Sequence, residues 1–297
     1  MPQRTLDVGA AHVTAVCDVV GDFPAPLDIA FPQVEAAAWD PYRRRYPEAF
    51  SGPDRWRLRD WCFLVGAGGR LVLVDTGVGQ AGTPGAQWIG ASGRLPEELA
   101  AAGVQPADVD MVVLTHLHLD HVGWNLAWDG DRPRPRFPQA RYLIQRADWE
   151  LFATGGDDND REAFERCVHP LQTLGVLQLL DGDHVLTPEL TLLHTPGHTP
   201  GSQSLLVASD GHAVLLWGDA ANHPAQLSEP TWCPRSDVQP ETARRTRREL
   251  LDRLEAERMW LAPAHFPEPF GAVIRVEGRR CWSPHQSTAV DNRPGAS

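Results

Sequence analysis

The sequence predicts an α/β (α+β) protein in which two mixed β-sheets pack face to face between helices, as an αββα sandwich. Short strands rich in β-branched residues occur in both halves of the chain, helical segments lie among them, and glycine-containing turns join neighbouring strands into hairpins. The length of 297 residues and the 42% content of hydrophobic residues suit one large domain. We therefore expect a single domain over residues 1–282.

Strands are predicted where apolar and β-branched residues alternate between turns. In the first half these segments are residues 12–19, 61–65, 70–75, 111–115 and 141–145, and in the second half residues 190–195, 202–208 and 212–217. The turns Gly66-Ala67-Gly68-Gly69 and Asp210-Gly211 are typical of hairpins, so the strands on either side of each turn should pair.

Helices are predicted at residues 96–102, 146–154, 161–174 and 240–257. Two further segments show neither the alternation typical of a strand nor the spacing of apolar residues typical of a helix. Residues 31–58 combine many aromatic side chains with prolines and arginines, so we expect an inserted aromatic loop that forms a lid or wall over the site. Residues 283–297 are polar and contain prolines, and we expect a flexible tail there.

The charge balance excludes several classes of partner and chemistry. The net charge is −12, whereas nucleic-acid and anionic membrane binding depend on dense positive charge, so we expect a small-molecule substrate and neither nucleic acid nor membrane as partner. All 27 basic residues are arginine, which excludes Schiff-base chemistry on a lysine.

The five cysteines are widely spaced and form no C-x-x-C pair, so we expect reduced thiols. No apolar run reaches the length of a membrane span, and residues 1–10 lack the pattern of a secretion signal. A cytoplasmic protein is the expectation, and a homodimer is one alternative for its assembly, with residues 31–58 against the same segment of a second copy.

Four side chains that bind metals occur within six residues, directly after a predicted strand. They are His116, His118, Asp120 and His121, in the segment Thr115-His116-Leu117-His118-Leu119-Asp120-His121. Imidazole and carboxylate groups are the ligands of zinc and of related divalent metals, and a turn at the end of a strand can direct all four into one cavity. The segment therefore predicts a metal site.

This H-x-H-x-D-H segment resembles the signature of the metallo-β-lactamase superfamily. The other marks of that family follow in order: Val74-Asp75-Thr76-Gly77, Thr195-Pro196-Gly197-His198-Thr199, Gly218-Asp219 and Ala264-His265-Phe266. The resemblance extends over most of the chain, roughly residues 58–282. It implies the αββα fold and a binuclear metal centre.

The resemblance also implies which residues hold the metals. His116, His118 and His198 would bind one ion, Asp120, His121 and His265 the other, and Asp219 would bridge them. Asp75 would accept a hydrogen bond from a ligand histidine without touching a metal. Zinc suits this nitrogen and oxygen set, although manganese, cobalt and iron also accept it.

A pair of metals lowers the pKa of a shared water, so the resemblance implies a metal-bridging hydroxide as the nucleophile of a hydrolase. Asp120 is a candidate to take up the proton as the intermediate collapses. The preferred substrate is predicted to be a neutral lactone or carboxylic ester with an apolar arm. Phosphotriester (organophosphate) hydrolysis, thioester hydrolysis and a mononuclear iron enzyme that oxidises persulfides remain the alternatives.

Within the superfamily, the chain resembles the subgroup of acyl-homoserine lactonases and methyl-parathion-type hydrolases. The residues that carry this resemblance are His121-Val122-Gly123-Trp124-Asn125, residues 218–226 and Pro263-Ala264-His265-Phe266-Pro267. The lactonases have a tyrosine three residues after the bridging aspartate, where this chain has Asn222. Asn222 and His223 are therefore the candidate donors to a developing oxyanion.

Small-molecule cavities are mostly apolar, and we expect Trp124, Phe137 and Trp149 to line this one, together with aromatic residues of 31–58. We expect no arginine directed at a substrate anion.

Overall fold

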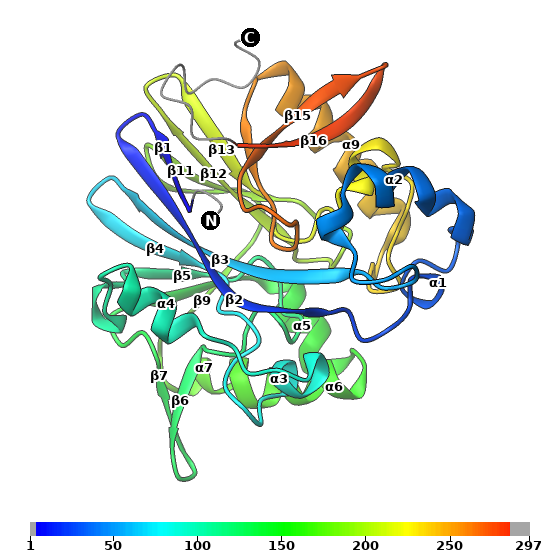
Figure 1. The fold of residues 1–297 in the computed structure, drawn as a ribbon. Coiled ribbons are helices and arrows are strands. Elements are labelled where there is room, and N and C mark those ends of the chain that lie inside the picture. The colour runs from blue at the N-terminus through cyan, green and yellow to red at the C-terminus, as the bar shows by residue number, and fades with distance from the viewer. Residues whose placement is uncertain (1–3, 286–297) are drawn as a thin grey trace.

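A computed structural model describes residues 4–285, and most of its strands form two seven-stranded sheets (Figure 1). The first sheet has the order β1 (Thr5–Val8), β2 (Ala11–Asp22), β3 (Arg57–Ala67), β4 (Arg70–Val74), β5 (Met111–Val113), β8 (Arg141–Gln145) and β9 (Leu177–Leu180). The second has the order β10 (His184–Thr187), β11 (Leu190–His194), β12 (Gln203–Ser209), β13 (His212–Leu216), β14 (Trp260–Ala262), β15 (Gly271–Val276) and β16 (Arg279–Pro284). A separate hairpin, β6 (Leu126–Asp129) and β7 (Arg132–Pro135), projects from the body.

Both sheets are mixed, as predicted. Strands β1 to β4 pair antiparallel, whereas β4, β5, β8 and β9 are parallel to one another. In the second sheet only β13 and β14 are parallel. The predicted turns at Gly66–Gly69 and Asp210-Gly211 join β3 to β4 and β12 to β13. Because parallel neighbours end at the same edge, β4 and β5 direct their following loops to one place, as do β13 and β14.

The main core lies between the two sheets. Alternation along β3 sends Trp61, Phe63 and Val65 into this layer, where they meet second-sheet residues such as Leu192 and Leu205. The intervening residues Cys62 and Leu64 face the opposite way, into a second cluster. Burial of both faces of β3 makes the sheet an internal layer of the sandwich.

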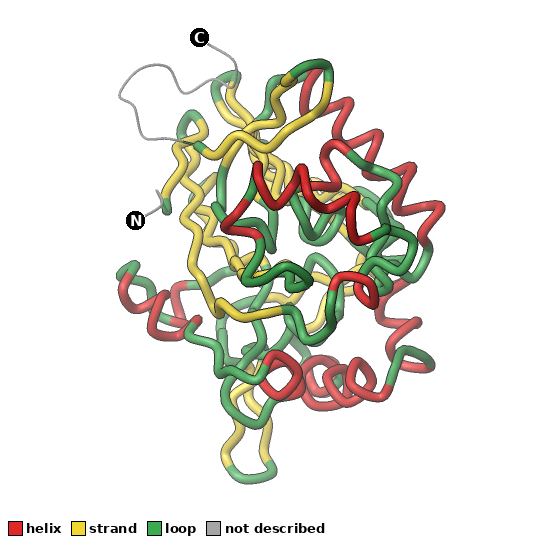
Figure 2. The backbone as a smooth tube through the Cα atoms, turned by 45° about the vertical axis from the view of Figure 1, so that its right-hand side comes forward, coloured by secondary structure: helices red, strands yellow, loops and turns green. Residues whose placement is uncertain are grey.

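Helices cover the outer faces of both sheets (Figure 2). The first group is α3 (Pro84–Ile89), α4 (Leu95–Ala101), α5 (Arg146–Thr154), α6 (Asp158–Ala163), a π-helical turn (Phe164–Val168) and α7 (Pro170–Thr173). The second group is α1 (Leu27–Ala30), α2 (Asp40–Arg45), α8 (Ala225–Ser228) and α9 (Pro240–Ala256). Short 3-10 turns lie at Ala36–Trp39, Pro47–Ala49 and Pro106–Asp108. The observed architecture is the predicted αββα sandwich.

The single helix predicted at residues 161–174 differs most from the structure, which has two short helices joined by a π-helical turn. Helix α6 begins earlier, at Asp158, and the chain widens into a π-helical turn before α7 starts at Pro170. Proline has no N–H to donate and its ring crowds the carbonyl four residues earlier, so a continuous α-helix cannot pass through this position.

Residues 31–58 are not a loop but a chain of short helices packed into the third cluster of the core. Trp39 and Phe31 are fully buried, and their neighbours in this cluster include Trp217, Ala221 and Leu251. Since aromatic side chains bury large apolar areas, this contact with the second helical layer explains why the segment is ordered.

The predicted tail is partly corrected. Ser283 and Pro284 belong to β16, where Ser283 is the register partner of Ala272 and Pro284 that of Gly271. His285 is also ordered, since its backbone N–H donates to the carbonyl of Phe270 at 2.8 Å. Residues 286–297 of the predicted tail lie outside the described residues. Among residues 4–285, no helix combines the length and the apolar character required to cross a membrane.

Candidate metal centre

The predicted metal ligands lie in loops that follow the ends of strands in both sheets. His116, His118, Asp120 and His121 follow β5, and His198 lies in the loop between β11 and β12. Asp219 and His265 follow the parallel strands β13 and β14. The strand order therefore brings together residues that are up to 149 positions apart, from 116 to 265.

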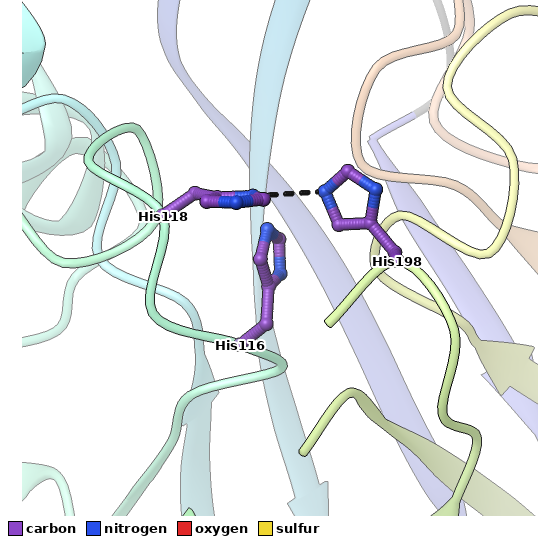
Figure 3. A group of neighbouring side chains, drawn as sticks. All are labelled: His116, His118 and His198. Carbon is purple, nitrogen blue, oxygen red and sulfur yellow. Dashed lines mark hydrogen bonds between the residues drawn. The ribbon is translucent and has the colours of Figure 1, made fainter. Parts of the chain in front are cut away.

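The first donor group consists of His116, His118 and His198 (Figure 3). The Nδ1 atom of His118 lies 2.9 Å from the Nε2 atom of His198, and the His116 ring centroid lies 4.7 Å from the centroid of each of the other two rings. His116 and His198 are almost fully buried. Three imidazoles thus converge on one small volume.

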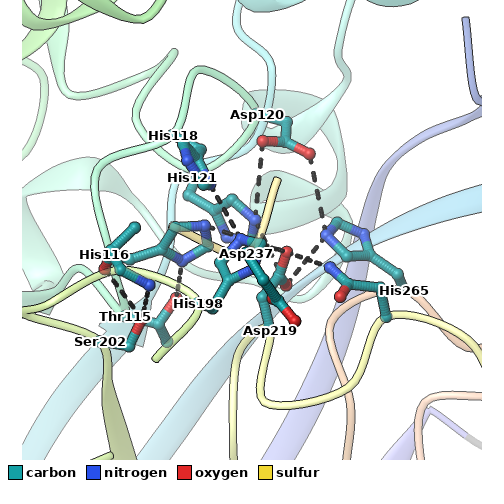
Figure 4. Close-up of polar contacts among 12 residues, drawn as sticks. Thr115, His116, His118, Asp120, His121, His198, Ser202, Asp219, Asp237 and His265 are labelled. Atoms are coloured by element: carbon teal, nitrogen blue, oxygen red, sulfur yellow. Dashed lines mark hydrogen bonds and ion pairs between the residues drawn. The ribbon is translucent and has the colours of Figure 1, made fainter. Parts of the chain in front are cut away.

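The second donor group consists of Asp120, His121 and His265 (Figure 4). The carboxylate oxygens of Asp120 lie 3.7 Å from the Nε2 atom of His121 and 3.7 Å from that of His265. His121 is fully buried, and the Asp120 side chain keeps 11% of its surface exposed toward the cavity described below.

Asp219 lies between the two groups and presents one oxygen to each. Its Oδ2 atom is 3.3 Å from the Nε2 atom of His198, and its Oδ1 atom is 3.1 Å from that of His265. Gly218 permits this placement: its φ is +57°, and a Cβ there would lie 2.7 Å from the Cβ of Thr115. The geometry is that of a carboxylate able to bridge two cations.

The donor atoms fit a pair of metal ions. Ligand atoms about 2 Å from a tetrahedral ion lie about 3.3 Å apart, which is close to the 2.9–3.9 Å separations of these donors. Within residues 4–285, the Nε2 atoms of His116, His121 and His265 and Oδ1 of Asp219 are buried with no hydrogen-bond partner. Unpaired buried donors and acceptors are costly, and a cation would satisfy all of them.

The electrostatics of the first group and of Asp219 agree with this fit. Burial and the neighbouring histidines hold the pKa values of His116 and His118 well below their usual range, so both stay neutral. Burial acts to raise the pKa of Asp219, but His265 and His121 outweigh it and bring that pKa well below its usual range. Neutral imidazole and ionised carboxylate are the forms that bind metals. In the second group, burial acts to lower the pKa values of His121 and His265, but neighbouring carboxylates outweigh it and raise that of His265 to about 9, so a metal ion would displace a proton from each ring.

Asp75 contacts His121 on the side of the ring opposite the second donor group. Its Oδ2 atom lies 2.9 Å from the Nδ1 atom of His121 and accepts a hydrogen bond from the Thr115 hydroxyl at 2.8 Å. Its Oδ1 atom accepts from the Thr115 backbone N–H at 2.7 Å. With Nδ1 of His121 engaged in this way, Nε2 is the atom directed at the second donor group.

Asp237 performs the same task for His198 and was not predicted. Its Oδ1 atom lies 2.8 Å from Nδ1 of His198, and its Oδ2 atom accepts from the fully buried guanidinium of Arg247 at 3.2 Å. Arg247 also donates to the carbonyl of Ala220, beside Asp219. Asp237 stands in a loop without a motif, so no pattern in one sequence distinguishes it from a surface aspartate.

Replacing Asp237 with asparagine should weaken metal binding by about 10-fold to 100-fold, the usual effect of losing a carboxylate partner of a ligand histidine. Competition with a metal chelator measures this affinity. The control is Asp7→Asn, because Asp7 also contacts a histidine, His12, at 2.7 Å, but on the surface. Equal metal affinity in the two variants would show that Asp237 does not support the centre.

A cavity of about 490 Å³ opens onto the two donor groups. Its apolar wall includes Phe23, Ile29, Trp56, Leu58, Trp88, Leu151 and Phe152. Of residues 31–58, only Trp56 and Leu58 line it, so this segment contributes part of a wall rather than a flap. The volume and lining suit a small molecule with an apolar part.

Other predicted wall residues lie elsewhere. Trp124 is buried beside Asp18, to which its Nε1–H donates at 2.9 Å, Phe137 is in the second core cluster, and Trp149 packs on Phe164. One arginine, Arg235, is among the residues that line the cavity. Asp157 and Asp160 line it as well, so the lining is not entirely apolar.

The two candidate oxyanion donors have different positions. Asn222 lines the cavity, and its Nδ2 atom donates to Oδ2 of Asp219 at 2.5 Å. His223 is not among the lining residues: its ring is enclosed by Trp39, Phe50 and Trp56, and burial lowers its pKa to about 3. Its Nδ1 atom accepts from the Ala225 backbone N–H at 3.1 Å. The structure thus places Asn222 at the site and His223 in the aromatic core.

The sequence matches one known family over most of this fold. Residues 56–265 match the family model described as the metallo-beta-lactamase superfamily, which is more than half of the chain. The chain belongs to the metallo-β-lactamase superfamily.

Similar sequences include proteins named N-acyl homoserine lactonase. One from Bacillus sp is 29% identical over 175 residues, which cover 54% of this chain and 63% of that protein. The N-acyl homoserine lactonase AttM from Rhizobium radiobacter is 38% identical over 132 residues, covering 42% of this chain and 46% of AttM. The chain therefore matches less than two thirds of the length of each.

Two solved structures share the fold over almost the whole chain. AidC, described as a dizinc quorum-quenching lactonase in complex with a product, has a TM-score of 0.80 at 19% identity and covers 97% of this chain and 98% of its own. The hydrolase AbOPH has a TM-score of 0.79 at 22% identity, with coverages of 96% and 97%. At these identities the likeness establishes the fold.

Proposed function

We propose that this protein is a binuclear metal-dependent hydrolase that opens lactones or cleaves carboxylic esters. One observation carries the proposal: a group of three histidines and a group of two histidines and an aspartate lie on either side of the Asp219 carboxylate, beside a partly apolar cavity. The similar proteins named N-acyl homoserine lactonase support the lactone as substrate class.

His116, His118 and His198 would hold one divalent ion, Asp120, His121 and His265 the other, with Asp219 between them. Zinc is the proposed metal, since four-coordinate sites with histidine and carboxylate ligands suit it. When bound, two such ions would acidify a shared water and polarise the carbonyl of the substrate.

The other steps belong to side chains of this protein. Asp120 has both carboxylate oxygens near the second group and lines the cavity, so it is placed to take a proton and pass it to the leaving oxygen. Asp75 and Asp237 hold His121 and His198 in the orientations described above. The apolar wall excludes water from the arm of the substrate.

Trp88 offers a test of the apolar wall. It lies in α3, lines the cavity and contacts Phe23 edge to face, with ring centroids 5.4 Å apart. Trp88→Ala should raise KM for a long-armed lactone by about 10-fold, because an apolar contact of this size contributes about 1–3 kcal/mol. KM for a lactone without an arm should stay nearly constant.

The matched control is Trp128→Ala, since Trp128 is 44% exposed on the β6–β7 hairpin and does not line the cavity. Equal KM values of Trp88→Ala and Trp128→Ala for the long-armed lactone would show that this wall does not bind an apolar arm of the substrate.

Asn222 remains the proposed donor to the developing oxyanion. One of its two amide hydrogens is directed at Asp219, which leaves the other for the substrate. Asn222→Ala should lower turnover of a lactone by about 10²-fold to 10³-fold, the range for loss of one oxyanion donor. Metal content, measured by elemental analysis, should not change. A variant with normal turnover would show that the metals act without this donor.

The proposed function is tested by a substrate screen on the purified protein with zinc. Acyl lactones and aryl esters should be hydrolysed, with phosphotriesters and thioesters cleaved more slowly. Efficient cleavage of phosphotriesters or thioesters with no action on lactones or esters would replace the proposed substrate. If the protein instead binds one iron ion per chain and consumes oxygen in the presence of a persulfide, it is a persulfide-oxidising enzyme and not a hydrolase.

A further inference from the structure

Helix α5 carries a buried carboxylate that contacts the loops on both sides of the first donor group. Asp148 is fully buried in the first turn of this helix. Its Oδ1 atom accepts from the Gly201 backbone N–H at 2.6 Å, and its Oδ2 atom accepts from the Thr199 hydroxyl at 2.8 Å. Burial raises the pKa of Asp148 to about 6, and the Leu117 backbone N–H is among the neighbouring groups that act to lower it.

These partners are the immediate neighbours of metal ligands. Leu117 stands between His116 and His118, and Thr199 follows His198. The two loops are about 80 residues apart in sequence, and the distance between His118 and His198 depends on how they are held together. Asp148 therefore lies between the two loops. Among the described residues, it forms no hydrogen bond with a metal ligand.

The local packing indicates that this connection is specific. A Cβ at residue 201 would lie 2.6 Å from the backbone nitrogen of Asp148, so only glycine allows the loop to approach the carboxylate this closely. Four residues along the same helix face, Phe152 packs edge to face on the ring of His118, with centroids 5.6 Å apart. Helix α5 thus touches both loops with two side chains.

We propose that Asp148 is a positioning residue that sets the spacing of His116, His118 and His198 and so determines the affinity of the first metal ion. The second donor group has no contact with Asp148 among the described residues and should be little affected. This inference rests on the proposed metal centre. Its test measures metal binding without substrate, so its failure is distinct from a failure of the lactonase proposal.

Metal affinity measured by chelator competition tests the proposal. In Asp148→Ala, the ion in the first donor group should bind about 10-fold to 100-fold more weakly, the usual effect of losing a residue that orients a ligand. The ion in the second donor group should keep its affinity. The same change should weaken the remaining ion in a His265→Gln background, where the first group is intact. It should have no effect in a His198→Gln background, where the first group is already broken.

The control is Asp110→Ala, because Asp110 also accepts a backbone N–H, that of Leu71 at 2.8 Å, but at the opposite end of β5 from the metal loop. Asp148→Asn is the second variant: its amide oxygen can still accept from Gly201, so it should fold and recover part of the lost affinity. If Asp148→Ala does not fold, the same comparison is made with Asp148→Asn: the first ion should bind more weakly and the second ion with unchanged affinity. Equal weakening of both ions, or of neither, in a folded variant would overturn the proposal.

Discussion

Asp120→Asn will lower turnover of a lactone by about 10²-fold to 10⁴-fold, the range for loss of a general acid or base. Asparagine keeps the shape and one carbonyl oxygen, so a ligand atom near His121 and His265 remains, but the amide cannot take up a proton. KM should change far less than kcat, because the step that is lost follows substrate binding.

Steady-state kinetics at saturating zinc measure both constants, and elemental analysis shows whether the metals stay bound. The control is Asp183→Asn, a matched change at an exposed carboxylate that accepts from the His194 backbone N–H. If Asp120→Asn keeps two metals and near-normal turnover, Asp120 has no role in proton transfer.

Removal of metal will lower the melting temperature by an amount on the order of 10 °C. An ion that binds only the folded chain, at about a thousand times its dissociation constant, adds about 4 kcal/mol of stability. Each kcal/mol shifts the melting temperature by about 2–4 °C in large single domains. The donor atoms that lose their partner are fully buried, so the metal-free chain also retains unpaired polar groups.

Thermal unfolding with and without a strong chelator measures this effect, and added zinc should restore the original value. In the double variant His116→Ala and His265→Ala, which disrupts both groups, the chelator should cause no shift. A wild-type melting temperature that is insensitive to the chelator would mean that no metal is bound in the folded state.

The layers of the fold and the convergence of the ligands could be predicted from the sequence because both depend on local patterns. Hydrophobic alternation identified β2, β3, β4, β5 and β8 of the first sheet and β11, β12 and β13 of the second, but not β14, β15 or β16. The ordered motifs identified the residues that follow β5, β13 and β14. Shorter or edge strands such as β1, β9 and β10 were missed because four residues between turns carry too little pattern.

The surroundings of the ligands could not be predicted in the same way. Trp124 and Trp56 are both buried aromatic residues next to polar neighbours, yet only Trp56 lines the cavity. Periodicity indicates that a side chain is buried but not which of three clusters receives it. His223 shows the same limit, since four residues after Asp219 the chain has already turned into the aromatic core.

Outer carboxylates were predicted only where a motif contains them. Asp75 belongs to the Val74-Asp75-Thr76-Gly77 segment and was assigned to support a ligand histidine, which agrees with its contact with His121. Asp237, which contacts His198, and Asp148, which contacts the residue after His198, lie in a loop and a helix without a motif. Their roles depend on tertiary contacts that a single sequence does not display.

A zinc titration of the metal-free protein, with lactone opening followed at each addition, tests the binuclear hydrolase most directly. Two donor groups joined by Asp219 predict that activity rises until two ions are bound per chain and is constant beyond that ratio. Activity that reaches its maximum at one ion per chain, or no lactone opening with two ions bound, would contradict the account.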